Sequence, residues 1–208
     1  MRIVLADDHP IVRSGVRTLL ERDHSTVKVV AEASTADELH RALDATPCDM
    51  VITDFNMPGG RMSDGLSLLG MLHRKWPDLP VIVLTIVSNP GVLHSIMATG
   101  ARGLVNKSEA LSQLHLAVEA VAQGRIYLGV AMEQALQSTQ ARDGKVALSI
   151  RESEVFRLFA SGLTVSQIAR QLNRSVKTVS RQKVDAMAKL SIENDIDVYT
   201  YARRHGLL

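Results

Sequence analysis

Short apolar runs alternate with segments of helical periodicity along the first 125 residues. The apolar runs span Arg2–Ala6, Val27–Ala33, Met50–Thr53, Val81–Leu84 and Gly103–Val105. Apolar residues recur at helical spacing in the segments Ile11–Glu21, Ala36–Ala45, Gly65–Lys75, Pro90–Thr99 and Ala110–Gln123. Runs that are apolar at nearly every position are typical of parallel strands that helices cover on both faces. The pattern therefore predicts a doubly wound (βα)5 domain of the α/β class over residues 1–125.

The periodicity changes after residue 125. Residues 126–148 show only a weak pattern, and the stretch 134–145 (QALQSTQARDGK) is polar, so this part is expected to be a linker. Four helix-period segments follow without a convincing strand: Glu152–Ser161, Val165–Leu172, Lys177–Leu190 and Asp195–His205. Ser149, with Glu152 three positions later, matches the capping box that opens many helices. Residues 149–208 are therefore expected to form an all-α domain of four helices.

The composition fits two ordinary globular domains. The chain has 208 residues, of which 46% are hydrophobic and 22% charged, and single domains most often span about 100 to 150 residues. Its single cysteine, Cys48, excludes an intrachain disulfide and a multi-cysteine metal site. Charged residues interrupt every apolar stretch before a membrane-spanning length of about 18 residues accumulates, and no signal-peptide pattern opens the chain. A soluble, cytoplasmic protein without a membrane partner is expected.

Charge is distributed unevenly between the two predicted domains. Residues 1–130 contain 12 Lys and Arg against 14 Asp and Glu, whereas residues 149–208 contain 10 against 6. A basic C-terminal domain favours a polyanionic partner such as nucleic acid. Aromatic residues make up only 3% of the chain, which disfavours binding by stacking on single-stranded bases.

Polar residues that could carry chemistry follow the predicted strands. Asp7 and Asp8 follow the first strand, Asp54 the third, Thr85 the fourth, and Lys107 the fifth. Ligands of open parallel sheets bind beyond these carboxyl ends. Three converging carboxylates would repel one another unless a cation relieved them, and oxygen ligands suit Mg²⁺. With the metal bound, Asp54 could attack phosphorus to form an aspartyl-phosphate, while Lys107 and Thr85 could stabilise the phosphoryl oxygens.

Each of these residues also has an ordinary structural explanation. An Asp or Thr at a strand end is commonly a helix cap or a turn residue, and a single lysine is usually solvated. Their joint occurrence at four strand ends favours the functional interpretation. The histidines lack zinc-type spacing, His9 is assigned no role, and Cys48 has no obvious neighbouring base, so metalloprotease and thiol chemistry are disfavoured.

In order and spacing, these residues resemble the receiver domains of bacterial two-component response regulators. The acidic pair, the segment 53–58 (TDFNMP), Thr85 and Lys107 carry the resemblance, which covers about the first 125 residues. It implies a flavodoxin-like fold with Asp54 as the phospho-acceptor.

The same resemblance implies a Mg²⁺ site in the acidic pocket. Asp8 would bind the metal directly, Asp7 through a water molecule, and Asp54 through its carboxylate. The backbone carbonyl of Asn56 would be a further ligand.

Two positions depart from the usual receiver pattern. An aromatic switch residue is common in the fifth strand, where this chain has Leu104, which puts aromatic switching in doubt. Ile86 is bulkier than the small residue often found after the threonine. If this side chain restricts access to Asp54, autodephosphorylation should be slow.

The last domain contains a candidate helix-turn-helix. Its second helix, from about residue 177, would enter the major groove of DNA. The predicted DNA contacts are Lys177, Thr178, Ser180, Arg181, Lys183, Val184 and Arg174, with Arg174 and Lys183 at phosphates. Charges on an amphipathic helix are often merely solvated. However, residues 168–172 (IARQL), 175–179 (SVKTV) and 187–190 (MAKL) resemble the LuxR-type helix-turn-helix of NarL/FixJ regulators.

The resemblance implies a transcription factor that a histidine kinase or phosphotransfer protein phosphorylates on Asp54. Phosphorylation would modulate homodimerisation and promoter binding, with auxiliary regulators as further partners. One alternative is a phosphorylation-independent regulator controlled by a ligand or a partner protein. A phosphatase acting through an aspartyl-phosphate is disfavoured, because Asn56 stands where such an enzyme would need a second carboxylate, so the chain is not expected to be an enzyme.

Overall fold

The computed structural model describes residues 1–23, 26–140 and 148–204, apart from the side chains at positions 23, 111, 138–140, 150 and 204. Two compact units divide the chain. The first comprises Met1–Thr85 with Ile96–Glu133, and the second Ile86–Ser95 with Gln134–Leu208. Among the described residues, no helix has both the length and the apolar character needed to span a bilayer.

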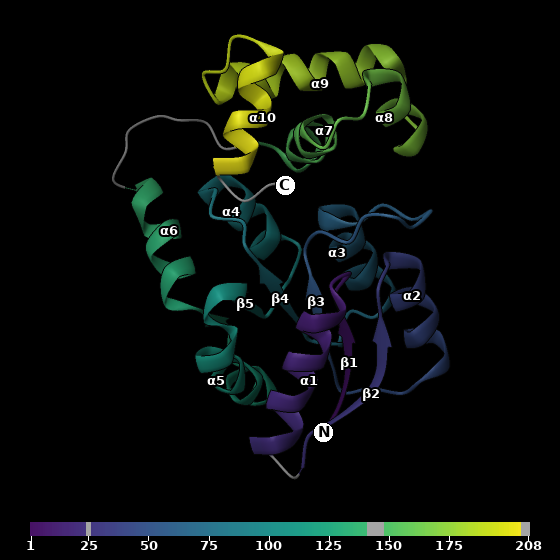
Figure 1. Ribbon diagram of the computed structural model, residues 1–208, viewed down its shortest axis with the longest axis vertical. Coiled ribbons are helices and arrows are strands. Elements are labelled where there is room, and N and C mark those ends of the chain that lie inside the picture. Colours follow the sequence, from purple (N-terminus) through teal and green to yellow (C-terminus); the bar gives the residue numbers. More distant parts are fainter. Residues whose placement is uncertain (24–25, 141–147, 205–208) are drawn as a thin grey trace. The chain divides into compact units, whose positions relative to one another are not determined.

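A parallel sheet forms the centre of the first unit (Figure 1). Its strands are β1 (Arg2–Ala6), β2 (Lys28–Ala33), β3 (Met50–Asp54), β4 (Val81–Thr85), β5 (Gly103–Asn106) and β6 (Tyr127–Leu128). They lie in the order β2-β1-β3-β4-β5-β6. Every residue of β3 and β4 is buried, which explains why these strands are apolar at almost every position. The α/β doubly wound class predicted from the sequence is confirmed.

Helices cover both faces of this sheet. The helices that alternate with the strands are α1 (Pro10–Asp23), α2 (Ala36–Ala45), α3 (Gly65–Lys75), α4 (Pro90–Ala98) and α5 (Ala110–Ala122), with a short 3-10 helix at Lys107–Glu109. Buried residues of α1 and α5 form one core with inward residues of the strands, including Leu20, Leu114 and Ile52. In Figure 1, α2 and α3 lie on the opposite side of the sheet.

The region predicted to be a linker contains regular structure at its start. Tyr127 and Leu128 extend the sheet as β6, in parallel register with Gly103 and Leu104. The helix α6 (Val130–Gln140) follows directly. A strand of two residues is too short to leave a periodic pattern, so the sequence contains no signal for it. Residues 141–147 lie outside the described residues, and the domain boundaries at 125 and 148 stay predictions.

Four helices follow after residue 148. They are α7 (Ile150–Ala160), α8 (Val165–Gln171), α9 (Val176–Lys189) and α10 (Asp195–Arg204). The capping box of Ser149 and Glu152 is present, and Thr164 with Gln167 forms a second one at α8. The core joins Val155 of α7 to residues of α8 and α9, among them Ile168 and Val179. The predicted all-α domain is confirmed, although His205 lies outside the described residues.

Candidate functional site

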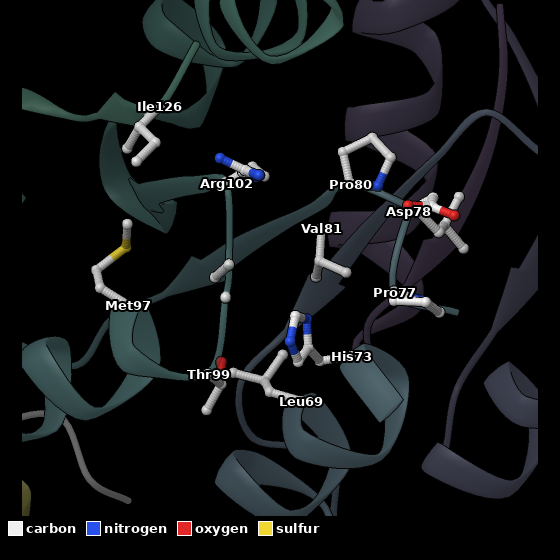
Figure 2. Close-up of a pocket in the computed structure, with 13 residues that line it drawn as sticks. Leu69, His73, Pro77, Asp78, Pro80, Val81, Met97, Thr99, Arg102 and Ile126 are labelled. Carbon is white, nitrogen blue, oxygen red and sulfur yellow. The ribbon is translucent and has the colours of Figure 1, made fainter. Parts of the chain in front are cut away.

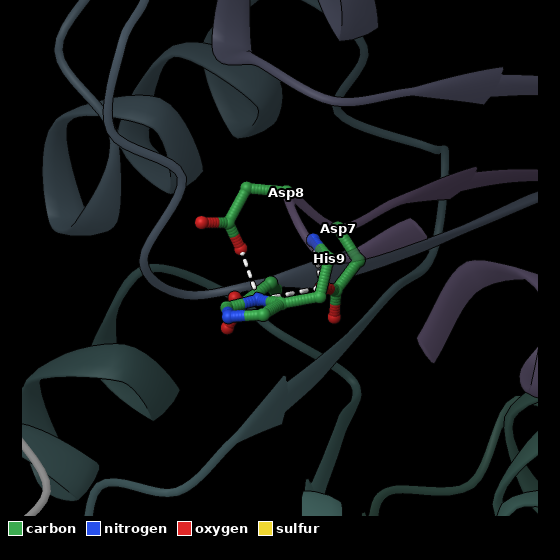
Figure 3. A group of neighbouring side chains, drawn as sticks. Asp7, Asp8 and His9 are labelled. Atoms are coloured by element: carbon green, nitrogen blue, oxygen red, sulfur yellow. Dashed lines mark hydrogen bonds and ion pairs between the residues drawn. The ribbon is translucent and has the colours of Figure 1, made fainter. Parts of the chain in front are cut away.

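An acidic cluster lies at the carboxyl ends of β1 and β3. These strands are adjacent and parallel, with Ala6 opposite Thr53, so the residues that follow them meet. Asp7, Asp8, His9 and Asp54 each offer one ligand atom, and these atoms all lie within 4.8 Å of one another. Figure 3 shows the side chains of Asp7, Asp8 and His9 gathered beyond the end of β1. The structure thus brings together the three carboxylates that the sequence predicts.

Lys107 links two of these carboxylates. Its Nζ lies 2.7 Å from Asp7 Oδ2 and 2.7 Å from Asp54 Oδ2. The lysine follows β5 directly, which brings it to the same edge of the sheet. One ammonium group therefore neutralises part of the charge that the buried carboxylates accumulate.

Burial and charge act in opposite directions on Asp54. Burial raises the pKa of Asp54 to about 6, although the Lys107 ammonium opposes this rise, and the nearby Asp7 carboxylate adds to it. Burial lowers the pKa of Lys107, but attraction by Asp54 and Asp7 outweighs burial and raises that pKa overall. At neutral pH Lys107 is a cation, and Asp54 is mostly an anion with an unusually high proton affinity.

His9 joins the cluster, although the sequence interpretation assigned it no role. Its backbone N–H donates to Asp7 Oδ1 at 2.9 Å, and its Nδ1 lies 2.6 Å from Asp8 Oδ1. The signal available in the sequence was its place directly after the acidic pair. The ring is largely exposed, so His9 borders the cluster from the solvent side.

The chemistry of the donor set suits a hard divalent cation. The three carboxylates provide oxygen ligands, and Asp7 is completely buried. Nearby, the buried side-chain oxygen of Asn56 has no hydrogen-bond partner among the described residues, while the Asn56 backbone N–H donates to Asp54 Oδ1 at 3.2 Å. Such oxygen-rich sites bind Mg²⁺ or Ca²⁺ in preference to softer metals.

The remaining receiver positions lie on the neighbouring strands. Thr85 is the buried last residue of β4 and stands opposite Asn106 of β5. Leu104, at the position of the usual aromatic switch, is completely buried within the sheet, and Ile86 is 50% exposed. Residues from the ends of β1, β3, β4 and β5 thus contribute to one edge, as expected for a doubly wound sheet.

A separate cavity of about 530 Å³ lies at the opposite ends of β4 and β5. Figure 2 shows its walls, which include Leu69 and His73 of α3, Met97 of α4, and Arg102 just before β5. None of the acidic residues of the cluster lines this cavity. The buried carboxylates and the raised pKa of Asp54 lie at the acidic cluster, which is therefore the better candidate for chemistry.

The helix-turn-helix is formed by α8 and α9. Most predicted DNA contacts are exposed on α9, namely Lys177, Thr178, Ser180, Arg181 and Val184. The opposite side of α9 buries Val179 and Met187. Ser175 caps the helix by accepting the backbone N–H of Thr178 at 3.1 Å. The polar face at the start of α9 is therefore exposed to solvent and available to contact DNA.

Two of the predicted phosphate contacts are engaged within the protein. Arg174 forms an ion pair of 2.8 Å with Glu154 of α7. Lys183 lies over the Phe159 ring at 3.7 Å from its centroid and 2.6 Å from Asp195. Both cations hold helices of this domain together, a role that sequence periodicity alone does not reveal.

Comparison with known proteins gives two family matches. Residues 3–119 match the response regulator receiver domain, and residues 146–202 match the bacterial regulatory proteins of the luxR family. The chain is 40% identical to the transcriptional regulatory protein RcsB of Escherichia coli K12 over 202 residues, covering 97% of this chain and 93% of that protein. It is 32% identical to the response regulator UvrY of E. coli O6:H1 over 212 residues, covering 100% and 95%.

Solved structures agree with these matches. RcsB of Salmonella enterica serovar Typhimurium, bound to the promoter P1flhDC with the phosphomimetic BeF3⁻, superimposes with a TM-score of 0.86 at 39% identity, covering 97% of each chain. The same protein bound to the rprA promoter gives a TM-score of 0.85 at 39% identity, covering 98% of each chain. With a receiver domain followed by a luxR-family domain, the chain belongs to the NarL/FixJ family of response regulators.

Proposed function

We propose that this response regulator accepts a phosphoryl group on Asp54 and that phosphorylation modulates its dimerisation and its binding to promoter DNA. The observation that carries the proposal is the position of Asp54, which is buried beside the carboxylates of Asp7 and Asp8 and is paired with Lys107 at 2.7 Å. A relative, RcsB of Salmonella, has been solved bound to promoter DNA in the presence of the phosphomimetic BeF3⁻, which supports the same activity for this chain.

The transfer step uses the Asp54 carboxylate as a nucleophile. With a pKa of about 6, the carboxyl group is mostly ionised at neutral pH, so an oxygen can attack the phosphorus of a phosphohistidine. The new O–P bond forms as the P–N bond breaks, and the bonding electrons leave with the imidazole of the donor. Lys107 balances negative charge on the phosphoryl oxygens, and the Thr85 hydroxyl donates a hydrogen bond to one of them.

Asp7, Asp8, Asp54 and the backbone carbonyl of Asn56 are the proposed Mg²⁺ ligands, with Asp7 acting through water. When bound, the cation neutralises charge on the phosphoryl oxygens and on the carboxylates that surround them. The three carboxylates of the acidic cluster, which outnumber the one nitrogen ligand that His9 offers, support this choice of metal.

The exposed N-terminal part of α9 is the proposed reading surface for the major groove. Lys177, Thr178, Ser180, Arg181 and Val184 would contact base edges, because the first residues of a recognition helix lie deepest in the groove. Arg174 and Lys183 would lie at phosphates. Their ion pairs with Glu154 and Asp195 support a smaller contribution to affinity than that of Arg181.

The proposal requires three kinds of partner. A cognate histidine kinase or phosphotransfer protein supplies the phosphoryl group. Promoter DNA binds α9 in its major groove, and a second copy of the chain forms a homodimer with the first when Asp54 is phosphorylated. Auxiliary regulators are further partners in this proposal. A protein that acts on promoter DNA in this way works in the cytoplasm.

The first experiment compares the intact masses of the wild type and the Asp54→Ala variant after incubation with acetyl phosphate and Mg²⁺. We expect a phosphoryl adduct on the wild type only, with both proteins giving the same circular dichroism spectrum. An adduct on both proteins would place the acceptor elsewhere. If neither protein forms an adduct, even with a kinase or phosphotransfer protein as the donor, the phosphorylation-independent regulator is favoured. The observation that supports this alternative is that buried Leu104 stands where receiver domains commonly have an aromatic switch residue.

A further inference from the structure

The loop between β3 and α3 contains a buried carboxylate that the phosphoryl chemistry above does not use. Asp64 occupies the N-cap of α3, yet its side chain makes no capping hydrogen bond there. Instead its Oδ2 accepts the backbone N–H of Met57 at 2.8 Å, and the residue is only 4% exposed. The carboxylate is therefore directed across the loop, toward the residues that follow Asp54.

The Met57 N–H and the Asn56 carbonyl belong to one peptide unit. This unit is planar, and in the trans form its N–H and C=O point in opposite directions; no cis peptide bond occurs among the described residues. The hydrogen bond to Asp64 therefore fixes the plane of the unit and directs the Asn56 carbonyl away from Asp64. On its other side, Asn56 is held by its own N–H, which donates to Asp54 Oδ1 at 3.2 Å.

The Asp64 carboxylate also makes the Asn56 carbonyl oxygen a stronger ligand for a cation. A hydrogen bond from a backbone N–H to a carboxylate is stronger than a neutral one. In a low-dielectric interior it polarises the peptide unit and increases the negative partial charge on the carbonyl oxygen. A fixed, more negative oxygen is a better ligand for a hard cation, which binds chiefly through charge.

A second carboxylate anchors the same loop farther from Asn56. Asp37 of α2 accepts the backbone N–H groups of Arg61 and Met62 at 2.7 and 3.1 Å. A Cβ at Gly60 would clash with Asp37 Oδ2, so a larger residue there would have to displace this carboxylate. Asp37 thus holds the outer part of the loop rather than the Asn56–Met57 peptide, which makes it a matched control for Asp64.

We propose that Asp64 is a positioning residue for the divalent cation, because it holds the Asn56–Met57 peptide unit in the orientation that offers the Asn56 carbonyl to the acidic cluster. This inference rests on the proposed function, since the cation is taken to bind among Asp7, Asp8 and Asp54. It adds a residue that acts on the metal through the backbone, at a distance from the three carboxylates.

The test measures the dissociation constant of Mg²⁺ itself, by calorimetry, on the full-length, unphosphorylated protein. Residues that orient metal ligands typically change metal affinity by about 10-fold to 100-fold. We expect Asp64→Ala to weaken Mg²⁺ binding by about 10-fold, and Asp64→Asn to weaken it less, because its amide oxygen still accepts the Met57 N–H. Asp37→Ala should bind Mg²⁺ as the wild type does. Melting temperatures measured in a chelator report any loss of folding separately.

The outcomes separate this inference from the function on which it rests. Unchanged affinity in Asp64→Ala, or an equal loss in Asp37→Ala, overturns the positioning role while leaving the Mg²⁺ site intact. If the wild type binds no Mg²⁺, or if Asp8→Ala binds it as the wild type does, the proposed metal site itself is wrong. If Asp64→Ala does not fold, Asp64→Leu decides, because it removes the acceptor for the Met57 N–H while filling the buried space, and an unchanged dissociation constant in that variant overturns the proposal.

Discussion

At the scale of single residues, Asp54 is the clearest case of a side chain whose surroundings conflict with its charge. It is 5% exposed, and the Lys107 ammonium group that lies 2.7 Å from it is shared with Asp7. The residue types at the strand ends made the acidic cluster predictable from sequence. The sharing of Lys107 and the contact between His9 and Asp8 were not predictable, because they depend on rotamers and on tertiary packing.

The raised pKa of Asp54 predicts a pH-dependent cost to stability in the absence of metal. The folded-state pKa of about 6 exceeds the ordinary value of 3.8, so the folded state binds a proton more tightly than the unfolded state does. The free energy of unfolding of the wild type therefore falls as the pH rises between these two values. Asp54→Asn lacks this loss, so it should be more stable than the wild type by about 1–3 kcal/mol at pH 7 and by less at pH 4. Denaturant unfolding in a chelator measures the difference, with exposed Asp78→Asn as the control. A stability gain independent of pH would contradict the assignment.

Ile86 predicts a long lifetime for the phosphorylated state. It follows Thr85 directly and is 50% exposed, and the prediction supposes that a bulky side chain at this position restricts the access of water to an acyl phosphate at Asp54. The Ile86→Ala variant should lose its phosphoryl group several-fold faster, as measured by intact mass after the donor is removed. Ile126→Ala, at a similarly exposed isoleucine (58%), should keep the wild-type half-life. Equal half-lives for wild type and Ile86→Ala would show that this side chain does not limit hydrolysis.

At the scale of elements, the sequence predicts the helices and strands that bury whole apolar runs or faces. The bounds of β1, α2 and α3 agree with the predicted segments. Short or weakly patterned elements, such as β6, were missed because the sheet edge defines them through backbone bonds, for example from Tyr127 N–H to the Arg102 carbonyl at 2.9 Å. The proposed role of α9 as a recognition helix could be predicted from the LuxR-type motifs of the sequence, whereas the internal ion pair of Lys183 with Asp195 could not.

The exposed face of α9 predicts that Arg181 contributes to sequence recognition. Its side chain is 85% exposed, and its ion pair with Asp185 is long, at 3.8 Å. Arg181→Ala should weaken binding to a specific site by about 1–3 kcal/mol and weaken nonspecific binding less. Titration of both DNAs at one salt concentration measures this, with Arg203→Ala as an exposed control on α10. Equal losses on the two DNAs would make Arg181 a phosphate contact instead.

The start of α7 predicts an acid-sensitive stabilisation of the four-helix domain. Burial alone would raise the pKa of Glu152, but bonds from Lys189 and Ser149 outweigh it and hold this pKa below its ordinary value of 4.5. Ionised Glu152 therefore stabilises the fold at pH values above 4.5, and this stabilisation is lost as the pH falls through the lower pKa of the folded state. Glu152→Gln should cost about 1–2 kcal/mol at pH 7 and less at pH 3.

Unfolding curves at the two pH values measure this change. Exposed Glu193→Gln serves as the control and should be neutral at both. A cost of Glu152→Gln that does not shrink in acid would show that the ion pair with Lys189 contributes little.

At the scale of the whole molecule, the chain joins an acidic phosphorylation pocket to a basic helix-turn-helix. The family and the order of a receiver domain followed by a luxR-family domain could be inferred from motifs along the sequence, and the residues assigned to both sites stay predictions. The dimerisation surface and the regulated promoters could not, because they depend on the surfaces of a second copy and on DNA that the chain alone does not specify. We infer that phosphorylation of Asp54 in the first domain changes the affinity of α9 for DNA.

The most direct measurement of this claim is the affinity for a genomic promoter fragment recovered with the wild-type protein, at fixed salt, with and without BeF3⁻ and Mg²⁺. We expect BeF3⁻ to tighten DNA binding by the wild type and to leave the affinity of Asp54→Ala unchanged. An affinity of the wild type that is the same in both conditions would contradict it, and would identify the chain as a regulator that binds DNA independently of phosphorylation.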